Sequence, residues 1–124
     1  MVSTMSSSLL KDTKYVLEKC REASCPVIVQ TRGTPVLVVM DAAAFDYQFK
    51  NARKLPKGQM YVAYRPLRMP ITTLKCMYKT MEACNKADEP VYLQKFNTDE
   101  LVVMSFAVYE RLQNTKRVNR RRIL

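Results

Sequence analysis

The chain has no histidine, only two glycines among its 124 residues, and no long apolar run. Without histidine, and without a Cys-x-x-Cys pair among its four cysteines, it lacks the usual zinc ligands and the usual thiol redox motif. Gly33 and Gly58 lie far apart, so no glycine-rich loop can hold a phosphate. We therefore expect a protein that is not an enzyme and holds no metal or cofactor. Without a signal-peptide pattern or an apolar span, we expect it to be soluble and cytoplasmic.

What the chain does have is an internal repeat, since residues 5–48 match residues 69–112 without a gap. Two copies are too few for a solenoid, which needs at least three repeats to bury a continuous core. Each copy alone is also close to the size limit for an independent core, about 40 residues. We therefore expect two copies that face each other around a shared core, as the subunits of a symmetric dimer do. Matching positions include Cys20 and Cys84, Pro26 and Pro90, and Leu37–Met40 and Leu101–Met104.

Each copy has the sequence pattern of a strand, a helix, a hairpin and a second helix. In the second copy, Arg68–Ile71 predicts a short strand, and Thr72 or Thr73 is a good N-cap. Apolar residues from Leu74 to Cys84 then recur at helical spacing. After Pro90 the pattern predicts strands at Val91–Gln94 and Leu101–Met104, a turn at Asn97–Asp99, and a helix capped by Ser105.

The first copy predicts the same order of elements. Its first helix ends near Ala23, and its second begins at Asp41, which stands where Ser105 stands. The hairpin between them has predicted strands at Val27–Gln30 and Pro35–Met40 and a turn at Gly33-Thr34. Met60–Tyr64, between the copies, weakly predicts one more strand. The expected fold class is α+β, with two modules packed as a pseudo-two-fold dimer around a shared antiparallel sheet.

The net charge of +10 comes from two segments outside the modules. The first module, residues 1–50, has six basic and five acidic residues, and the second, 69–112, has five and six. The linker 51–68 and the tail 113–124 each have five basic residues and no acid. This distribution favours a polyanionic partner, most often nucleic acid. The alternative is that the basic segments only keep the protein soluble.

Cys20 and Cys84 occupy matching positions on the predicted apolar helix faces. We expect both to be small buried hydrophobic residues in a reducing compartment.

The order of elements and several sequence motifs resemble the Phd/YefM antitoxin domain. The second module carries the resemblance through Met69–Lys75, Glu89–Leu93 and Leu101–Ser105, and the first through Cys25–Val29 and Arg32–Met40. That family is obligately dimeric, so a tandem copy would supply both halves in one chain. The resemblance implies a DNA-binding domain that represses its own operon. In the family, the tail after the last helix wraps and neutralises a toxin.

The resemblance also implies where DNA would bind, namely near the start of the first helix and in the hairpin. The matching positions at the helix start are Lys11 and Lys75, and the candidates in the hairpin are Arg32 and Lys95. Cations related by a two-fold axis suit the phosphates of two half-sites. We further expect the basic linker and tail to clamp the DNA backbone, through Arg65, Arg68, Arg120, Arg121 and Arg122. The alternative for Lys11 and Lys75 is that both are ordinary solvated helix residues.

Gln30 and Gln94 are identical in the two copies and would read adenine edges if they were exposed. A polar face of a strand is the simpler explanation for both.

The tail, residues 113–124, differs from the toxin-binding tails of the family. It is short and basic and has almost no apolar repeat, although Val118, Ile123 and Leu124 offer a weak anchor. Two hypotheses therefore remain. The chain is a DNA-binding, antitoxin-like repressor that acts as a single-chain pseudo-dimer, or it is a protein-binding module that neutralises a toxin or inhibits another nucleic-acid-binding protein.

Overall fold

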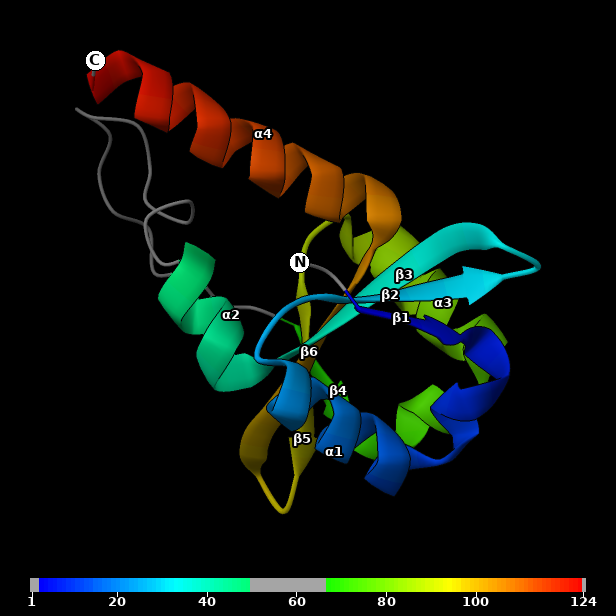
Figure 1. Ribbon diagram of the computed structural model, residues 1–124. Coiled ribbons are helices and arrows are strands. Elements are labelled where there is room, and N and C mark those ends of the chain that lie inside the picture. Colours follow the sequence, from blue (N-terminus) through cyan, green and yellow to red (C-terminus); the bar gives the residue numbers. More distant parts are fainter. Residues whose placement is uncertain (1–2, 50–66, 124) are drawn as a thin grey trace.

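The computed structural model describes residues 3–49 and 67–123, and for residues 115–123 only the backbone. These two stretches fold into two similar halves, each with a strand, a 3-10 helix, an α-helix, a hairpin and a second α-helix (Figure 1). The expected α+β class and the repeated strand-helix-hairpin-helix order are therefore confirmed. The first half contains β1 (Ser3–Ser6), η1 (Ser7–Lys11), α1 (Thr13–Ala23), β2 (Val27–Thr31), β3 (Thr34–Asp41) and α2 (Ala42–Phe49). The second contains β4 (Arg68–Pro70), η3 (Ile71–Lys75), α3 (Met77–Ala87), β5 (Val91–Lys95), β6 (Thr98–Ser105) and α4 (Phe106–Ile123).

The two halves contribute to one six-stranded sheet in the order β1-β2-β3-β6-β5-β4. The four inner strands are antiparallel, but β1 pairs with β2 and β4 pairs with β5 in parallel. The expectation of an antiparallel sheet is therefore wrong for both edges. The reason is the helix between each edge strand and its neighbour, because a helical crossover returns the chain in the same direction.

The two halves meet at the pairing of β3 with β6, and its register is symmetric. Val39 lies opposite Val103, which is its own equivalent in the repeat. On either side, Leu37 pairs with Ser105 and Asp41 pairs with Leu101. Leu37 and Leu101 are equivalent in the repeat, and so are Asp41 and Ser105, so the two pairs are related by the two-fold symmetry. The sheet is therefore continuous across the repeat and is centred on this valine pair.

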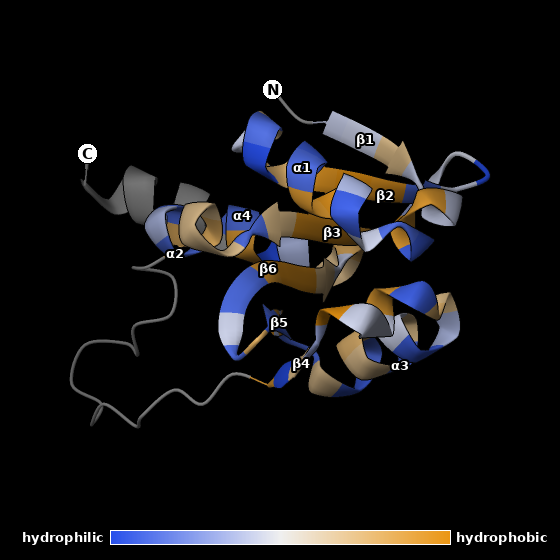
Figure 2. Ribbon diagram, turned by 90° about the horizontal axis from the view of Figure 1, so that it is seen from below, coloured by the Kyte–Doolittle hydropathy of each residue, from blue (hydrophilic) through white to orange (hydrophobic). Residues whose placement is uncertain are grey.

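Both faces of the sheet are covered. Leu37 and Val39 of β3 belong to the core beneath α1 and α3, whereas Val38 and Met40 belong to the core beneath α2 and α4. Because successive side chains of a strand point to opposite faces, a sheet buried on both sides needs a continuous apolar run. Figure 2 shows the central strands as hydrophobic and the helices around them as mixed.

The helices beyond the hairpins cross between the halves. Helix α2 of the first half packs on β6 of the second, and α4 of the second packs on β3 of the first. Phe45 and Phe49 of α2 are fully buried in the same core as Val108 and Tyr109 of α4. This core is therefore built jointly, as expected for modules too small to fold alone.

The helix caps predicted from the sequence are confirmed, but the start of each first helix is not. Ala44 N–H donates to Asp41 Oδ2 over 3.2 Å, and Val108 N–H donates to Ser105 Oγ over 3.2 Å. In contrast, Thr72 and Thr73 lie inside η3, and α3 begins only at Met77. A helical apolar spacing alone does not distinguish a 3-10 turn from the α-helix that follows it.

Both hairpin turns lie earlier than predicted. The turn residues are Arg32-Gly33 and Phe96-Asn97, and all four have positive φ, between 52° and 80°. Two-residue turns of this kind match the twist of the flanking strands. Thr34 and Thr98, predicted from the sequence to lie in the turns, instead begin β3 and β6, in keeping with the strand preference of β-branched residues. The strand predicted at Met60–Tyr64 lies outside the described residues.

Candidate nucleic-acid interface

Lys11 and Lys75 occupy the same place in the two halves. Each is the last residue of its 3-10 helix, and each side chain is exposed. Helices η1 and η3 contact each other, so the two lysines belong to one layer of the molecule, on the α1 and α3 side of the sheet. Within the described part of the chain, neither lysine forms an ion pair with an acidic residue. This layer therefore presents two equivalent cations.

The N-termini of α1 and α3 add to this positive character. Neither helix has an acidic residue in its first turn, and the N-terminus of a helix carries a partial positive charge. The two caps differ, however. Asp12 accepts a hydrogen bond from Tyr15 N–H over 3.1 Å, whereas Cys76, at the equivalent position, makes no such bond. Only the first helix therefore has a carboxylate at its start.

The two hairpin candidates occupy different places. Arg32 lies in the first turn, and Lys95 is the last residue of β5, immediately before the second turn. The repeat-equivalent of Arg32 is therefore Phe96, which is 91% exposed, and not Lys95. The ammonium group of Lys95 lies 5.9 Å from the centre of the Phe96 ring. Phe96 is not among the candidates predicted from the sequence, although it aligns with the candidate Arg32 in the repeat.

A groove of about 610 Å³ separates α1 from the second hairpin. Its floor is apolar and includes Leu17 and Ile71. Its charged groups are Lys14, Arg21, Lys95 and one acid, Glu18. The remaining residues of the lining are Thr13, Pro70, Thr72, Gln94 and Phe96. The groove brings Lys95 beside the first turn of α1, the helix that follows Lys11.

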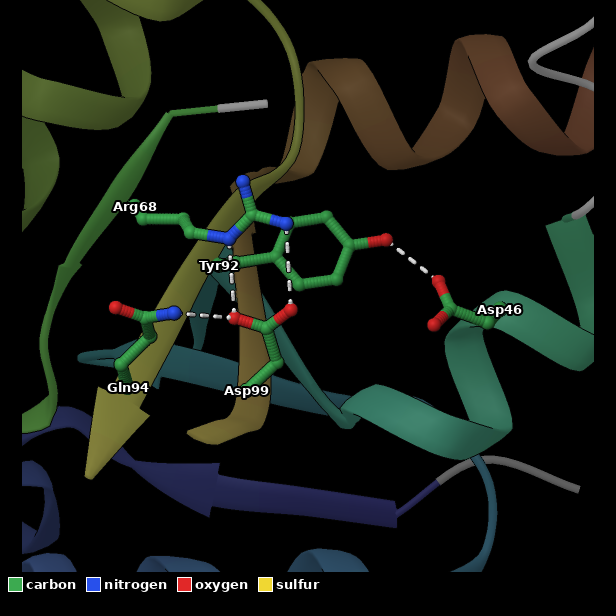
Figure 3. A network of polar contacts seen from close by, with 5 residues as sticks. All are labelled: Asp46, Arg68, Tyr92, Gln94 and Asp99. Carbon is green, nitrogen blue, oxygen red and sulfur yellow. Dashed lines mark hydrogen bonds and ion pairs between the residues drawn. The ribbon is translucent and has the colours of Figure 1, made fainter. Parts of the chain in front are cut away.

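Arg68 is held by groups of its own half of the chain (Figure 3). Its Nε lies 3.2 Å from Asp99 Oδ1, and its guanidinium lies 5.7 Å from the centre of the Tyr92 ring. Gln94 donates from Nε2 to the same Asp99 oxygen over 2.9 Å. A phosphate at Arg68 would have to compete with Asp99, and the Gln94 amide already has a partner other than a base edge.

Tyr92 extends this polar network to the first half of the chain. The hydroxyl of Tyr92 donates to Asp46 Oδ1 of α2 over 2.5 Å, as Figure 3 shows. The first half has no matching network, because the equivalents of Arg68, Tyr92, Asp99 and Asp46 are Thr4, Ile28, Pro35 and Glu110. The two halves therefore share a backbone but present different surfaces.

Among the candidates in the basic linker and tail, only Arg68 has a described side chain. Arg65 is outside the described residues, and the side chains of Arg120, Arg121 and Arg122 are outside them too. The backbone of those three arginines belongs to α4, whose base packs on the face of the sheet opposite to α1 and α3. The structure therefore brings Lys11 and Lys75 into one layer and assigns the start of the tail helix to the other.

The two cysteines at matching positions in the repeat are not reactive. Cys20 and Cys84 are buried as expected, and burial raises the pKa of both thiols to about 12. The nearby carboxylate of Asp41 raises the pKa of Cys20 further. Both thiols therefore stay protonated and unreactive near neutral pH.

The described residues contain no cluster of three or more histidine, cysteine, aspartate or glutamate side chains that would hold a metal ion. No helix among them is long and apolar enough to cross a membrane. In comparisons with known proteins, no family model, no curated protein and no solved structure matches the chain.

Proposed function

We propose that the chain is a DNA-binding transcriptional repressor of the Phd/YefM antitoxin type that acts as a single-chain pseudo-dimer. The observation that carries this proposal is the pair Lys11 and Lys75. Both are exposed, both are the last residue of a 3-10 helix at equivalent positions, and the two 3-10 helices touch across the repeat. A dimeric regulator uses such an arrangement to contact equivalent phosphates of two half-sites.

In this proposal the two halves divide the duplex between them. Lys11 and the start of α1 contact the backbone of one half-site, and Lys75 and the start of α3 contact that of the other. Backbone contacts fix register and orientation but do not read sequence. Since the halves differ in their hairpin turns and in the Arg68–Asp99 network, the preferred operator is asymmetric in sequence.

A salt-titrated binding isotherm tests the proposal. The native protein is titrated onto the duplex upstream of its own gene and onto a scrambled duplex of equal length. We expect tighter binding to the native sequence and a steep loss of affinity with salt, because each phosphate contact releases counterions. Equal and weak binding to both duplexes would rule out the proposed repressor function.

The decisive variant is Lys11→Gln with Lys75→Gln. We expect the slope of log affinity against log salt to become shallower by about 2, since each phosphate contact contributes roughly 0.9. Lys19→Gln with Lys86→Gln is the matched control, because it removes the same charge from the later turns of α1 and α3, away from the helix starts. Equal effects of the two double variants would mean that DNA binding depends only on the net charge of the protein and not on the position of the lysines.

A second candidate function is favoured by α4. This helix has 18 residues, whereas its equivalent α2 is described over 8, and Figure 1 shows its last turns beyond the sheet. A helix of this kind is a common docking element for a protein partner. Here the protein would neutralise a toxin or inhibit another nucleic-acid-binding protein through its tail. Ile123→Ala with Leu124→Ala would then weaken a one-to-one complex with the product of a neighbouring toxin gene and leave DNA binding unchanged.

A further inference from the structure

The tip of the second hairpin carries an aromatic side chain that the fold does not use. Phe96 is 91% exposed, and its backbone has a φ of 52°, in the left-handed region. Single exposed apolar residues are common on protein surfaces, but a bulky residue with positive φ is an outlier. Within the described residues, the one ring contact of Phe96 is with Lys95, its neighbour in sequence.

The equivalent turn shows what the fold itself requires at this point. Two-residue turns with two positive φ angles favour asparagine, aspartate and glycine. The first hairpin has Arg32-Gly33 there, and the second has Phe96-Asn97. The two turns join equivalent strands, so a phenylalanine is not needed to close the second one. Phe96 therefore goes against the residue preference of the turn without a gain in packing, and such an exception indicates that its side chain contacts another molecule.

The surroundings of Phe96 indicate the chemistry of that contact. Phe96 borders the groove along α1, together with Lys95 and Lys14. The acid Glu18 also faces this groove, whereas Arg21 is held by Glu100 at 2.6 Å. An exposed ring that shares a groove with two lysines matches the way proteins bind nucleic acid, with cations on phosphates and an apolar side chain against the bases.

We propose that Phe96 is an aromatic wedge that enters the minor groove and inserts between two base pairs, while Lys95 and Lys14 contact the flanking phosphates. This inference rests on the DNA-binding function proposed above and adds to it a deformation of the duplex. The wedge acts on one half-site only, because the equivalent turn carries Arg32 in place of an aromatic residue. An arginine enters a narrow minor groove without unstacking the bases.

The test compares three variants by affinity and by DNA bending. Phe96→Asn removes the ring and restores a residue that the turn favours, so we expect it to melt no lower than the native protein by circular dichroism. Phe96→Trp keeps an aromatic wedge. Tyr47→Gln is the control, because it removes an aromatic side chain that is 89% exposed on α2, on the other side of the sheet.

Bending is followed by energy transfer between dyes at the two duplex ends, and unstacking by the fluorescence of 2-aminopurine at successive steps. The native protein should bend the duplex and raise the fluorescence at one step. Phe96→Asn should lose both signals and about tenfold in affinity, in line with the stacking contribution of one aromatic residue, and should keep the salt dependence of binding. Phe96→Trp and Tyr47→Gln should behave as the native protein does.

The outcomes separate this inference from the function on which it rests. If Phe96→Asn bends DNA like the native protein while the Lys11 and Lys75 double variant loses binding, the proposed insertion of Phe96 is wrong but the proposed repressor function is supported. If the native protein does not bind duplex DNA, both are wrong. If Phe96→Asn leaves DNA binding intact but breaks a complex with a protein partner, Phe96 is a protein anchor and the wedge is again wrong.

Discussion

At the scale of single residues, the repeat has kept its core and changed its polar groups. Cys20 and Cys84 are both buried against the same face of the sheet, and both are unreactive for the same physical reason. In contrast, the bond between Tyr92 and Asp46 has Ile28 and Glu110 at the equivalent positions. Packing therefore constrains both copies alike, whereas only part of the polar surface is kept, including the Lys11 and Lys75 pair.

The two buried thiols make stability depend on pH in the alkaline range. Their pKa is about 12 in the folded protein, against an ordinary value of 9.0. The unfolded chain therefore loses these protons first, so stability is unaffected below pH 9 and falls as the pH rises from 9 toward 12. The native protein is compared with the double variant Cys20→Ala and Cys84→Ala. We expect the difference between their free energies of unfolding to decrease by roughly 1 kcal/mol per thiol from pH 7 to pH 10. Urea unfolding of both proteins at the two pH values measures this, and a constant difference would contradict it.

The hydroxyl of Tyr92 is expected to stabilise the contact between the two halves. Tyr92 is 2% exposed, and its hydroxyl donates to the carboxylate of Asp46 on α2. We expect Tyr92→Phe to lower the free energy of unfolding by about 1–2 kcal/mol, because a hydrogen bond to a charged group is lost. Tyr47→Phe is the control, since Tyr47 is almost fully exposed. Equal losses in chemical unfolding would show that the Asp46 bond is not the cause.

At the scale of elements, the sequence predicted types and order better than boundaries. Apolar alternation and helical spacing were sufficient to find the repeated strand, helix, hairpin and helix. They did not separate η3 from α3, because a 3-10 turn and an α-helix bury residues at similar spacing. They also misplaced both turns, where the residues with positive φ include Arg32 and Phe96, which are not typical of turns.

The start of α3 offers a test at this scale. Asp12 caps α1 through Tyr15 N–H, whereas Cys76 leaves the start of α3 without a side-chain bond. We expect Cys76→Asn to raise the free energy of unfolding by about 0.5–1 kcal/mol, because asparagine is a strong N-cap. Asp12→Ala should lower it by a similar amount. The midpoints of urea unfolding give both values, and a destabilised Cys76→Asn would show that this position does not accept a cap.

At the scale of the whole molecule, the repeat predicted a joint core but not the direction of the edge strands. A shift that aligns two copies implies equivalent structures, and it says nothing about which strand joins them. The symmetric pairing of β3 with β6 around Val39 and Val103 therefore could not be predicted from the sequence pattern. The same holds for the candidate interface. The resemblance selected Lys11 and Lys75 at equivalent positions, but Phe96 became visible only once the turns were located.

The symmetric centre predicts that the two halves unfold as one unit. Val39 and Val103 are fully buried, and their strands form the only pairing between the halves within the described sheet. We expect Val39→Ala to destabilise the whole protein by about 1–3 kcal/mol, because it leaves a small cavity on the line where the halves join. Amide hydrogen exchange should then accelerate equally in β2 of the first half and β5 of the second, since both report global unfolding. Val103→Ala should give the same pattern. Faster exchange in β2 alone would mean that the two halves unfold separately. The chain would then not act as a single DNA-binding unit, and the pseudo-dimer proposal would be wrong.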